Sequence, residues 1–226
     1  MKALLLFLGL GLAGISAQAQ VAPSAAEAAA YTGLHAAAHL GKVDKILRLS
    51  ASGSALNATD GNGRTPVHVA AFARQREAIQ ALAKAGADLN LLDHDRYDAV
   101  TIAAVADDEA TLGVLLQLGA SAKQVTSRYD GTALIAAAHL GHDGVVRQLI
   151  AAGAPLDHVN NLHWTAVIES VVLGDGGPRH QATLKALLDA GASTQLADRA
   201  GHTPLALAKA RGYSAMVEML TKAGAR

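Results

Sequence analysis

The sequence contains no cysteine, and this absence excludes several kinds of protein at once. Without thiols, neither disulfides nor thiolate metal sites can hold the fold together. A cysteine nucleophile and a thioether-linked lipid anchor are excluded for the same reason. The fold must therefore be stabilised by the burial of apolar side chains.

The chain also lacks net charge and has few aromatic residues. Its 19 basic residues balance 19 acidic ones, whereas a nucleic-acid-binding surface needs lysine and arginine concentrated on one face. We therefore expect no nucleic-acid partner. Aromatic residues make up 3% of the chain although 51% of it is hydrophobic, and alanine supplies much of that fraction. This composition indicates helices that pack closely through small side chains.

Motifs of catalysis are missing as well. The chain has no Gly-x-Ser-x-Gly elbow and no zinc-protease helix. Ser170 follows Glu169, but no base is placed beside it by spacing. We therefore expect a protein that is not an enzyme and that needs no cofactor.

The N-terminus has the three zones of a secretory signal peptide. Lys2 precedes the apolar run Ala3–Ile15, and Ala17-Gln18-Ala19 supplies small residues for cleavage. The run of about 13 apolar residues falls short of the roughly 20 that a membrane-spanning helix needs. We predict a signal peptide over residues 1–19 with cleavage near Ala19, and no membrane insertion of the mature chain. The expected location is the periplasm of a Gram-negative bacterium, with secretion toward other cells as an alternative.

A leucine precedes a glycine by four residues six times along the chain. The successive glycines lie 33, 33, 34, 38 and 33 residues apart. A fixed period of this length indicates stacked structural repeats, which usually offer a binding face. The six pairs are Leu49/Gly53, Leu82/Gly86, Leu115/Gly119, Leu149/Gly153, Leu187/Gly191 and Leu220/Gly224.

One unit shows how each repeat is expected to fold. Thr65 is a good N-cap, and the missing N–H of Pro66 is harmless at the first helical position. A second helix is predicted from about Glu77 to Lys84, and Gly86 supplies the left-handed residue that ends it. An extended arm over Ala87–Asn90 then leads into the next unit. Each unit is therefore two antiparallel helices and a hairpin-like loop.

These units resemble the ankyrin repeat family. The resemblance rests on Thr65-Pro66-Val67-His68, on Gly141-His142 and on Gly86-Ala87, and it covers residues 32–226. It implies an all-α, L-shaped solenoid of about six units, in which hairpins project toward a concave face. It also implies structural roles, including backbone hydrogen bonds between repeats for His35, His68 and His142. The structural motif residues are Thr65, Pro66, His68, Gly86, Gly141, His142, Gly153, Gly191, Thr203 and Pro204.

The repeat boundaries follow from this register. Residues 20–31 form an N-terminal extension or cap, and the units span 32–64, 65–97, 98–131, 132–164, 165–202 and 203–226. Asp98 stands where the other units have threonine, and it can still cap a helix. The fifth unit carries five extra residues within Gly174–His180, which we interpret as a longer solvated loop. Its glycines do not have the spacing of a nucleotide-binding loop.

The resemblance implies that partners contact the hairpin tips and the exposed ends of the first helices. We call these positions the candidate strip, and we expect Trp164, Tyr129 and Tyr97 to anchor a partner protein there. The alternative is that these rings pack across adjacent hairpins. Candidate partner-binding residues are His39, Phe72, His94, Tyr97, Arg128, Tyr129, His139, Asn161, His163, Trp164 and Arg179. Asn62, Arg64, Arg199 and His202 also fall at tip positions, and Leu40, Val105, Leu140, Val172 and Leu173 at helix ends.

Ten histidines raise the possibility of metal binding. His35 and His39 are four residues apart on a helix, a spacing that can chelate zinc, but no third ligand is evident. We therefore predict no metal site. The favoured function is a monomeric, non-catalytic, exported adaptor that binds another protein. The alternatives are a histidine-rich protein for a small ligand or metal, and a stabilising or immunity partner of a periplasmic enzyme.

Overall fold

The computed structural model describes residues 20–226, and the predicted signal peptide with its cleavage site lies outside them. Helices account for all the regular structure of this part, where Thr126 and Gly131 form an isolated β-bridge. No helix of residues 20–226 combines the length and apolar character needed to cross a membrane. The helices are α1 (Ala25–Ala30), α2 (Gly33–His39), α3 (Val43–Ala51), α4 (Pro66–Phe72), α5 (Arg76–Lys84), α6 (Ala99–Val105), α7 (Glu109–Gln117), α8 (Ala133–Leu140), α9 (Asp143–Ala151), α10 (Ala166–Val172), α11 (Pro178–Asp189), α12 (Pro204–Ala210) and α13 (Ser214–Lys222).

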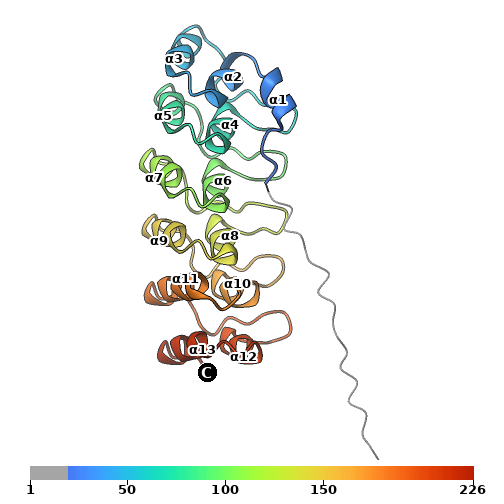
Figure 1. Ribbon diagram of the computed structural model, residues 1–226, viewed down its shortest axis with the longest axis vertical. Helices are drawn as coiled ribbons and strands as arrows, with labels where there is room; N and C mark the ends of the chain where they lie inside the picture. The colour runs from blue at the N-terminus through green and yellow to red at the C-terminus, as the bar shows by residue number, and fades with distance from the viewer. Residues whose placement is uncertain (1–19) are drawn as a thin grey trace, which may run out of the picture.

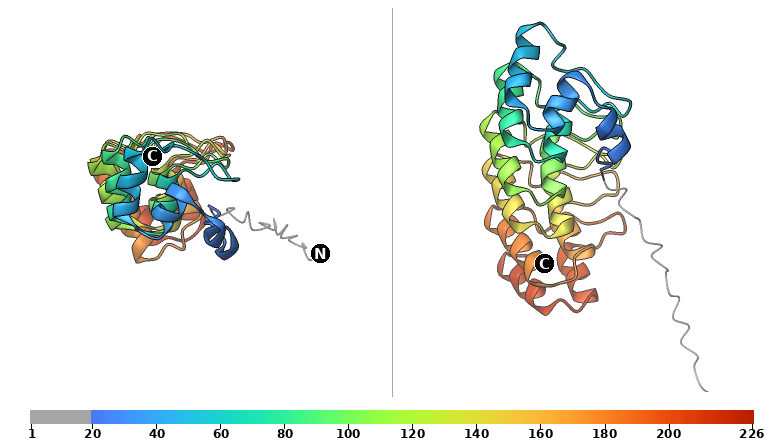
Figure 2. Two further views of the ribbon diagram at one scale, coloured as in Figure 1. Left: turned by 90° about the horizontal axis from the view of Figure 1, so that it is seen from above. Right: turned by 45° about the horizontal axis from the view of Figure 1, so that its top comes forward.

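The helices stack in two columns, as expected for a solenoid. The first helices of the units, α2 to α12 in even numbers, form one column, and the second helices, α3 to α13 in odd numbers, form the other (Figure 1). The connecting hairpins project from the even-numbered column to one side (Figures 1 and 2). Each unit contacts mainly its neighbours. The surface is therefore a repeated series of helix ends and hairpins.

The N-caps form as the sequence predicts in five of the six units. The hydroxyl oxygen of Thr165 accepts a 3.2 Å hydrogen bond from the Ile168 amide, and the Asp98 carboxylate accepts one of 2.7 Å from Thr101. Asp98 therefore replaces threonine as a cap. The first unit differs, because Thr32 makes no side-chain cap and Gly33 begins α2 with a φ of +54°.

The leucine–glycine pairs perform two separate tasks. The leucines are completely buried in all units but the first, where Leu49 is only partly buried. All six glycines have positive φ values, between +79° and +100°, which L-residues with side chains adopt only under strain. The pairs therefore place one core side chain and end one helix in every unit.

The insert of the fifth unit is partly helical, so the interpretation as a longer loop was only partly correct. Helix α11 has 12 residues, three more than α9, and Pro178 begins it. The remaining loop packs against the sixth unit, since the Tyr213 hydroxyl donates a 3.0 Å hydrogen bond to the Gly174 carbonyl. Most of the insert therefore extends the second helix at its N-terminus.

Residues 20–31 form a separate element at the N-terminal end of the stack. Helix α1 begins with a capping box between Ser24 and Glu27, and it lies beside α2 on the side from which the hairpins project (Figures 1 and 2). The segment therefore does not extend α2. It covers the first hairpin instead.

Candidate partner-binding surface

The hairpins are joined to one another by backbone hydrogen bonds. The His94 amide donates to the Asn62 carbonyl at 3.0 Å, and the Ser127 amide donates to the Arg96 carbonyl at 2.9 Å. The Asn161 amide continues the series with a 2.9 Å bond to the Tyr129 carbonyl. These bonds connect successive tips, so the candidate strip is held in one arrangement before any partner binds.

The three aromatic residues expected to anchor a partner all lie in this ladder with half-buried side chains. Tyr97 and Trp164 occupy matching positions in their hairpins, where their amides donate to Asp93 and Asn160 at 2.8 and 2.9 Å. The Tyr129 amide is held by the Ser127 hydroxyl at 3.2 Å. The backbones are thus fixed while part of each ring faces solvent.

The charges at the hairpin tips pair with one another across adjacent units. Arg96 lies 2.9 Å from Asp130, and Arg128 lies 3.7 Å from Asp95. These side chains are about half exposed, so each pair contributes little to stability. Their effect is to cancel charge along the tips.

The remaining tip residues of the candidate strip differ in exposure. His94, Asn161 and His163 are exposed, and His163 has a positive φ of +63°. Asn161 is the most constrained of them, since its side-chain amide donates a 3.0 Å bond to the Arg128 carbonyl.

Arg179 lies between units, away from the hairpins. It is the second residue of α11, and its guanidinium lies 2.7 Å from Asp107 and 3.9 Å from Asp143. These contacts join the third, fourth and fifth units where the paired helices connect. A partner that binds Arg179 must compete with Asp107.

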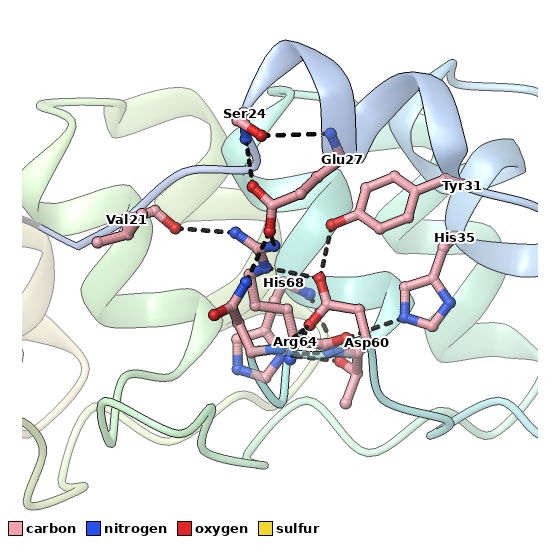
Figure 3. A network of polar contacts seen from close by, with 10 residues as sticks. Val21, Ser24, Glu27, Tyr31, His35, Asp60, Arg64 and His68 are labelled. Carbon is pink, nitrogen blue, oxygen red and sulfur yellow. Dashed lines mark hydrogen bonds and ion pairs between the residues drawn. The ribbon is translucent and has the colours of Figure 1, made fainter.

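Arg64 is buried, so its placement among the exposed tip residues was wrong. Its side chain is 1% exposed and lies at the centre of a polar network (Figure 3). The guanidinium contacts Asp60 at 2.7 Å, Glu27 at 2.5 Å and the Val21 carbonyl at 3.1 Å. Arg64 therefore joins the N-terminal segment to the first hairpin.

The network shifts the pKa values of its acids. Hydrogen bonds from Ser24 and from Arg64 lower the pKa of Glu27 to about 2. Burial alone would raise the pKa of Asp60, but hydrogen bonds from Tyr31 and Arg64 outweigh it and lower that pKa to about 2. The pKa of Tyr31 is raised by burial and by its bond to Asp60. Both carboxylates are therefore held in the charged form.

The N-terminal segment also covers the first helix end of the candidate strip. The ring of Tyr31 lies 5.4 Å from that of His35 and 6.3 Å from that of His39, centroid to centroid. His39 is half-buried. A partner therefore meets this end of the strip through Tyr31 rather than through His39 alone.

The structural histidines bind neighbouring backbones, as the resemblance implied. His68 is 2% exposed, and its Nδ1 accepts a 3.1 Å bond from the Thr65 amide while its Nε2 donates to the Tyr97 carbonyl at 3.0 Å. His35 contacts the Arg64 carbonyl and His142 the Ala104 carbonyl, both at 2.9 Å. Burial lowers the pKa of His68, which favours the neutral ring that these bonds require.

One polar group of this surface was missed in the sequence analysis. Glu169 in α10 is 4% exposed, and its Oε1 accepts a 3.2 Å bond from the Asn160 side-chain amide. His139 Nδ1 lies 3.3 Å from its Oε2. A comparison of the units position by position would have revealed the pair His139 and Glu169. The end of the first helix in one unit faces the middle of the first helix in the next unit.

The structure gives Ser170 no catalytic arrangement. Its hydroxyl is fully buried and donates a 2.8 Å bond to the Val167 carbonyl within the same helix. Within residues 20–226, no three histidine, aspartate or glutamate side chains are grouped in a way that would hold a metal ion.

Comparison with known proteins identifies the repeats. A family model described as ankyrin repeats (3 copies) matches residues 14–93, 34–126 and 100–198. The putative ankyrin repeat protein YahD of Escherichia coli K12 is 39% identical over 100 residues, which are 44% of this chain and 50% of that protein. The chain thus spans half the length of that curated relative.

Two solved structures are similar over most of the chain. An ankyrin repeat domain (ABAYE2397) from Acinetobacter baumannii AYE is 40% identical and covers 85% of this chain and 98% of its own, with a TM-score of 0.81. The ankyrin repeat protein EF0377 is 28% identical, with the same coverages and a TM-score of 0.78. Repeats of this kind are generally modules for protein–protein interaction and typically non-catalytic. The chain belongs to the ankyrin repeat family.

Proposed function

We propose that this chain is a non-catalytic, exported protein-binding module whose candidate strip binds a partner protein between the second and fifth units. The observation that carries the proposal is the hairpin ladder, which holds Tyr97, Tyr129 and Trp164 with their rings half-buried. Aromatic side chains fixed in this way are common anchors of protein interfaces.

The fixed backbone of the hairpin tips favours a higher affinity for a partner. Binding costs free energy when loops and side chains must be ordered on association. The backbone bonds from Asn62 through Tyr129 to Asn161 order the tips in advance. A partner therefore meets a surface that needs little rearrangement.

The middle of the stack is the preferred contact region. At the N-terminal end, α1 lies beside the first unit (Figure 2), and the Tyr31 ring lies next to those of His35 and His39. The second to fifth units combine the three aromatic rings with exposed apolar helix ends such as Leu140 and Leu173.

Affinity capture from a periplasmic extract tests the proposal. The immobilised protein is compared with a Tyr129→Ala, Trp164→Ala variant, and with a Leu47→Ala, Leu118→Ala control that removes exposed apolar side chains outside the strip. We expect a stoichiometric partner that the control retains and the strip variant loses. Retention by the strip variant, with its circular dichroism unchanged, would refute the proposal.

Export is tested separately. We expect the N-terminus of the protein recovered from its native host to be Gln20, which follows the predicted cleavage site at Ala19. N-terminal sequencing of the periplasmic fraction checks this. An N-terminus at Met1 would contradict the export proposal and leave the binding proposal standing.

A further inference from the structure

A carboxylate occupies a position of the fifth unit that is apolar in every other unit. Four residues after the opening residue of the first helix, the fifth unit has Glu169, whereas the matching residues are Ala36, Val69, Ile102, Ala136 and Leu207. Val69 and Ile102 are at most 1% exposed, and Glu169 is 4% exposed. A buried carboxylate is costly unless it is paired or neutralised. The substitution therefore calls for a partner group.

One oxygen of this carboxylate has its partner within the chain. Asn160 stands where other hairpins carry Asp60, Asp93 and Asp198. Its Oδ1 keeps the hairpin bonds, accepting from Leu162 and Trp164 at 3.0 and 2.9 Å. Its amide nitrogen donates to Glu169 Oε1 at 3.2 Å. An aspartate here would bring a second negative charge toward Glu169, so asparagine both keeps the hairpin and tolerates the carboxylate.

The other oxygen lacks a hydrogen-bond donor within the described part of the chain. Glu169 Oε2 lies 3.3 Å from His139 Nδ1, but this contact is not aligned as a hydrogen bond. His139 belongs to the candidate strip and its side chain is 31% exposed. The unpaired oxygen therefore lies directly behind an accessible side chain of that strip.

No lysine or arginine of the described residues is paired with this carboxylate. Within residues 20–226, Glu169 has no lysine or arginine within 4 Å. The arginines of the nearby tips are committed elsewhere, Arg128 to Asp95 and Arg96 to Asp130. Arg199 donates to the Asn161 carbonyl at 2.9 Å. Among the described residues, Glu169 is thus a buried carboxylate without a lysine or arginine partner, and the arginines near it are already paired.

We propose that Glu169, with His139 and Asn160 beside it, is the site that receives an arginine side chain of the partner protein. The guanidinium reaches Oε2 from the candidate strip when the His139 side chain moves aside. Arginine suits the site better than lysine because a guanidinium is weakly hydrated and binds carboxylates in a plane. This inference rests on the proposed function, and it specifies which chemistry of the partner is recognised.

Binding of a small guanidinium probe tests the site directly. N-acetyl-arginine amide is titrated into the isotopically labelled protein and followed by NMR, with the neutral N-acetyl-citrulline amide as the matched ligand. We expect shifts at Glu169, at His139 and at the indole of Trp164, whose amide is bound to Asn160. Citrulline amide should bind at least tenfold more weakly, equivalent to about 1.4 kcal/mol.

Two glutamine variants distinguish the Glu169 carboxylate from another carboxylate of the surface. Glu169→Gln keeps the shape and should weaken arginine amide binding at least tenfold, whereas Glu109→Gln, on an exposed face of α7, should leave it unchanged. Equal binding of the two amides, or unchanged binding by Glu169→Gln, would overturn the inference.

The midpoint of thermal unfolding provides a second test. If Glu169 had a structural role, its replacement would change the midpoint in the opposite direction. Leu207 occupies the matching position in the sixth unit, so Glu169→Leu restores the repeat pattern. For an unpaired receptor carboxylate we expect the midpoint of unfolding to rise by about 2–4 °C. A fall in the midpoint would overturn the inference, because it would mean that Glu169 stabilises the fold.

Partner capture distinguishes this inference from the proposed function. If the Tyr129→Ala, Trp164→Ala variant loses the partner while Glu169→Gln retains it fully, the arginine site is refuted and the binding strip stands. If both variants retain it, the proposed function fails as well. Loss of the partner by Glu169→Gln, together with weaker arginine amide binding, supports both.

Discussion

The Tyr31 hydroxyl donates a 2.6 Å hydrogen bond to the Asp60 carboxylate, joining residues 29 positions apart. The core leucine of the first unit, Leu49, is only partly buried. Within the described residues, the N-terminal segment packs against this unit and its hairpin. It uses a buried cation, Arg64, instead of the apolar stacking that joins the other units.

Replacing Arg64 with alanine should destabilise the N-terminal end of the stack. The substitution leaves Asp60 without its cation and removes the contacts to Glu27 and to the Val21 carbonyl. Breaking a buried ion pair on one side costs about 3 kcal/mol. We expect a loss of this size in urea unfolding and faster amide exchange over residues 20–31.

The matched control is Arg96→Ala, which breaks an exposed ion pair with Asp130. Such pairs are worth at most about 1 kcal/mol. Equal losses for the two arginine variants would show that Arg64 stabilises the protein no more than an exposed ion pair does.

The same network should weaken in acid. The pKa of Glu27 and that of Asp60 are both lowered to about 2 in the folded state, from ordinary values near 4. The unfolded chain therefore binds protons first, and stability falls as the pH drops from about 4 to about 2. Stability curves over this range, compared with those of Asp60→Asn, check the prediction. The variant should show a shallower fall, and a parallel fall would contradict it.

Most of the fold could be predicted because each structural task recurs in every unit. Thr65 and Thr165 open helices, and Gly86 and Gly153 end them with positive φ. Such local signals are read from short segments, and their repetition identifies the stack. The burial of Arg64 could not be read in this way. Its partner Glu27 comes from outside the repeats, and the hairpin position alone suggested an exposed side chain.

The insert of the fifth unit and the position of Glu169 are two further features that the sequence alone did not predict. Glycines in Gly174–Gly177 suggested a loop throughout, although Pro178 begins a helix that absorbs three of the added residues. Glu169 is next to Ser170 in the sequence, whereas in the fold its carboxylate contacts His139 and Asn160. Contacts between units depend on stacking, which the register predicts only when units are compared position by position.

The loop at Gly176 should tolerate no side chain. Gly176 has a φ of +71°, and a Cβ there would lie 2.6 Å from the ring of Tyr213. Gly201 has a similar φ of +83° but open space around it. Gly201→Ala should cost about 1 kcal/mol for the backbone alone, and Gly176→Ala should cost clearly more in urea unfolding. Equal costs would mean that Tyr213 moves aside freely.

The buried ring of His68 predicts a second pH dependence, near neutrality. Burial lowers the pKa of His68 below its ordinary value of 6.5, because desolvation disfavours the charged ring. A proton on Nδ1 would also remove the acceptor of the bond from the Thr65 amide. The unfolded chain then binds the proton more readily, so this contribution to stability is complete above about pH 6.5 and falls as the pH drops below it.

His68→Leu should remove this dependence while lowering stability by about 2 kcal/mol, because the Tyr97 carbonyl loses its donor and the Thr65 amide its acceptor. His94→Gln, at an exposed ring, should keep both the stability and its fall below pH 6.5. Urea unfolding of the three proteins between pH 8 and pH 5 (roughly the range in which histidine titrates) checks the prediction. If His68→Leu kept the same fall in stability as the wild type, the buried imidazole would not be its source, and the protons would have to bind elsewhere.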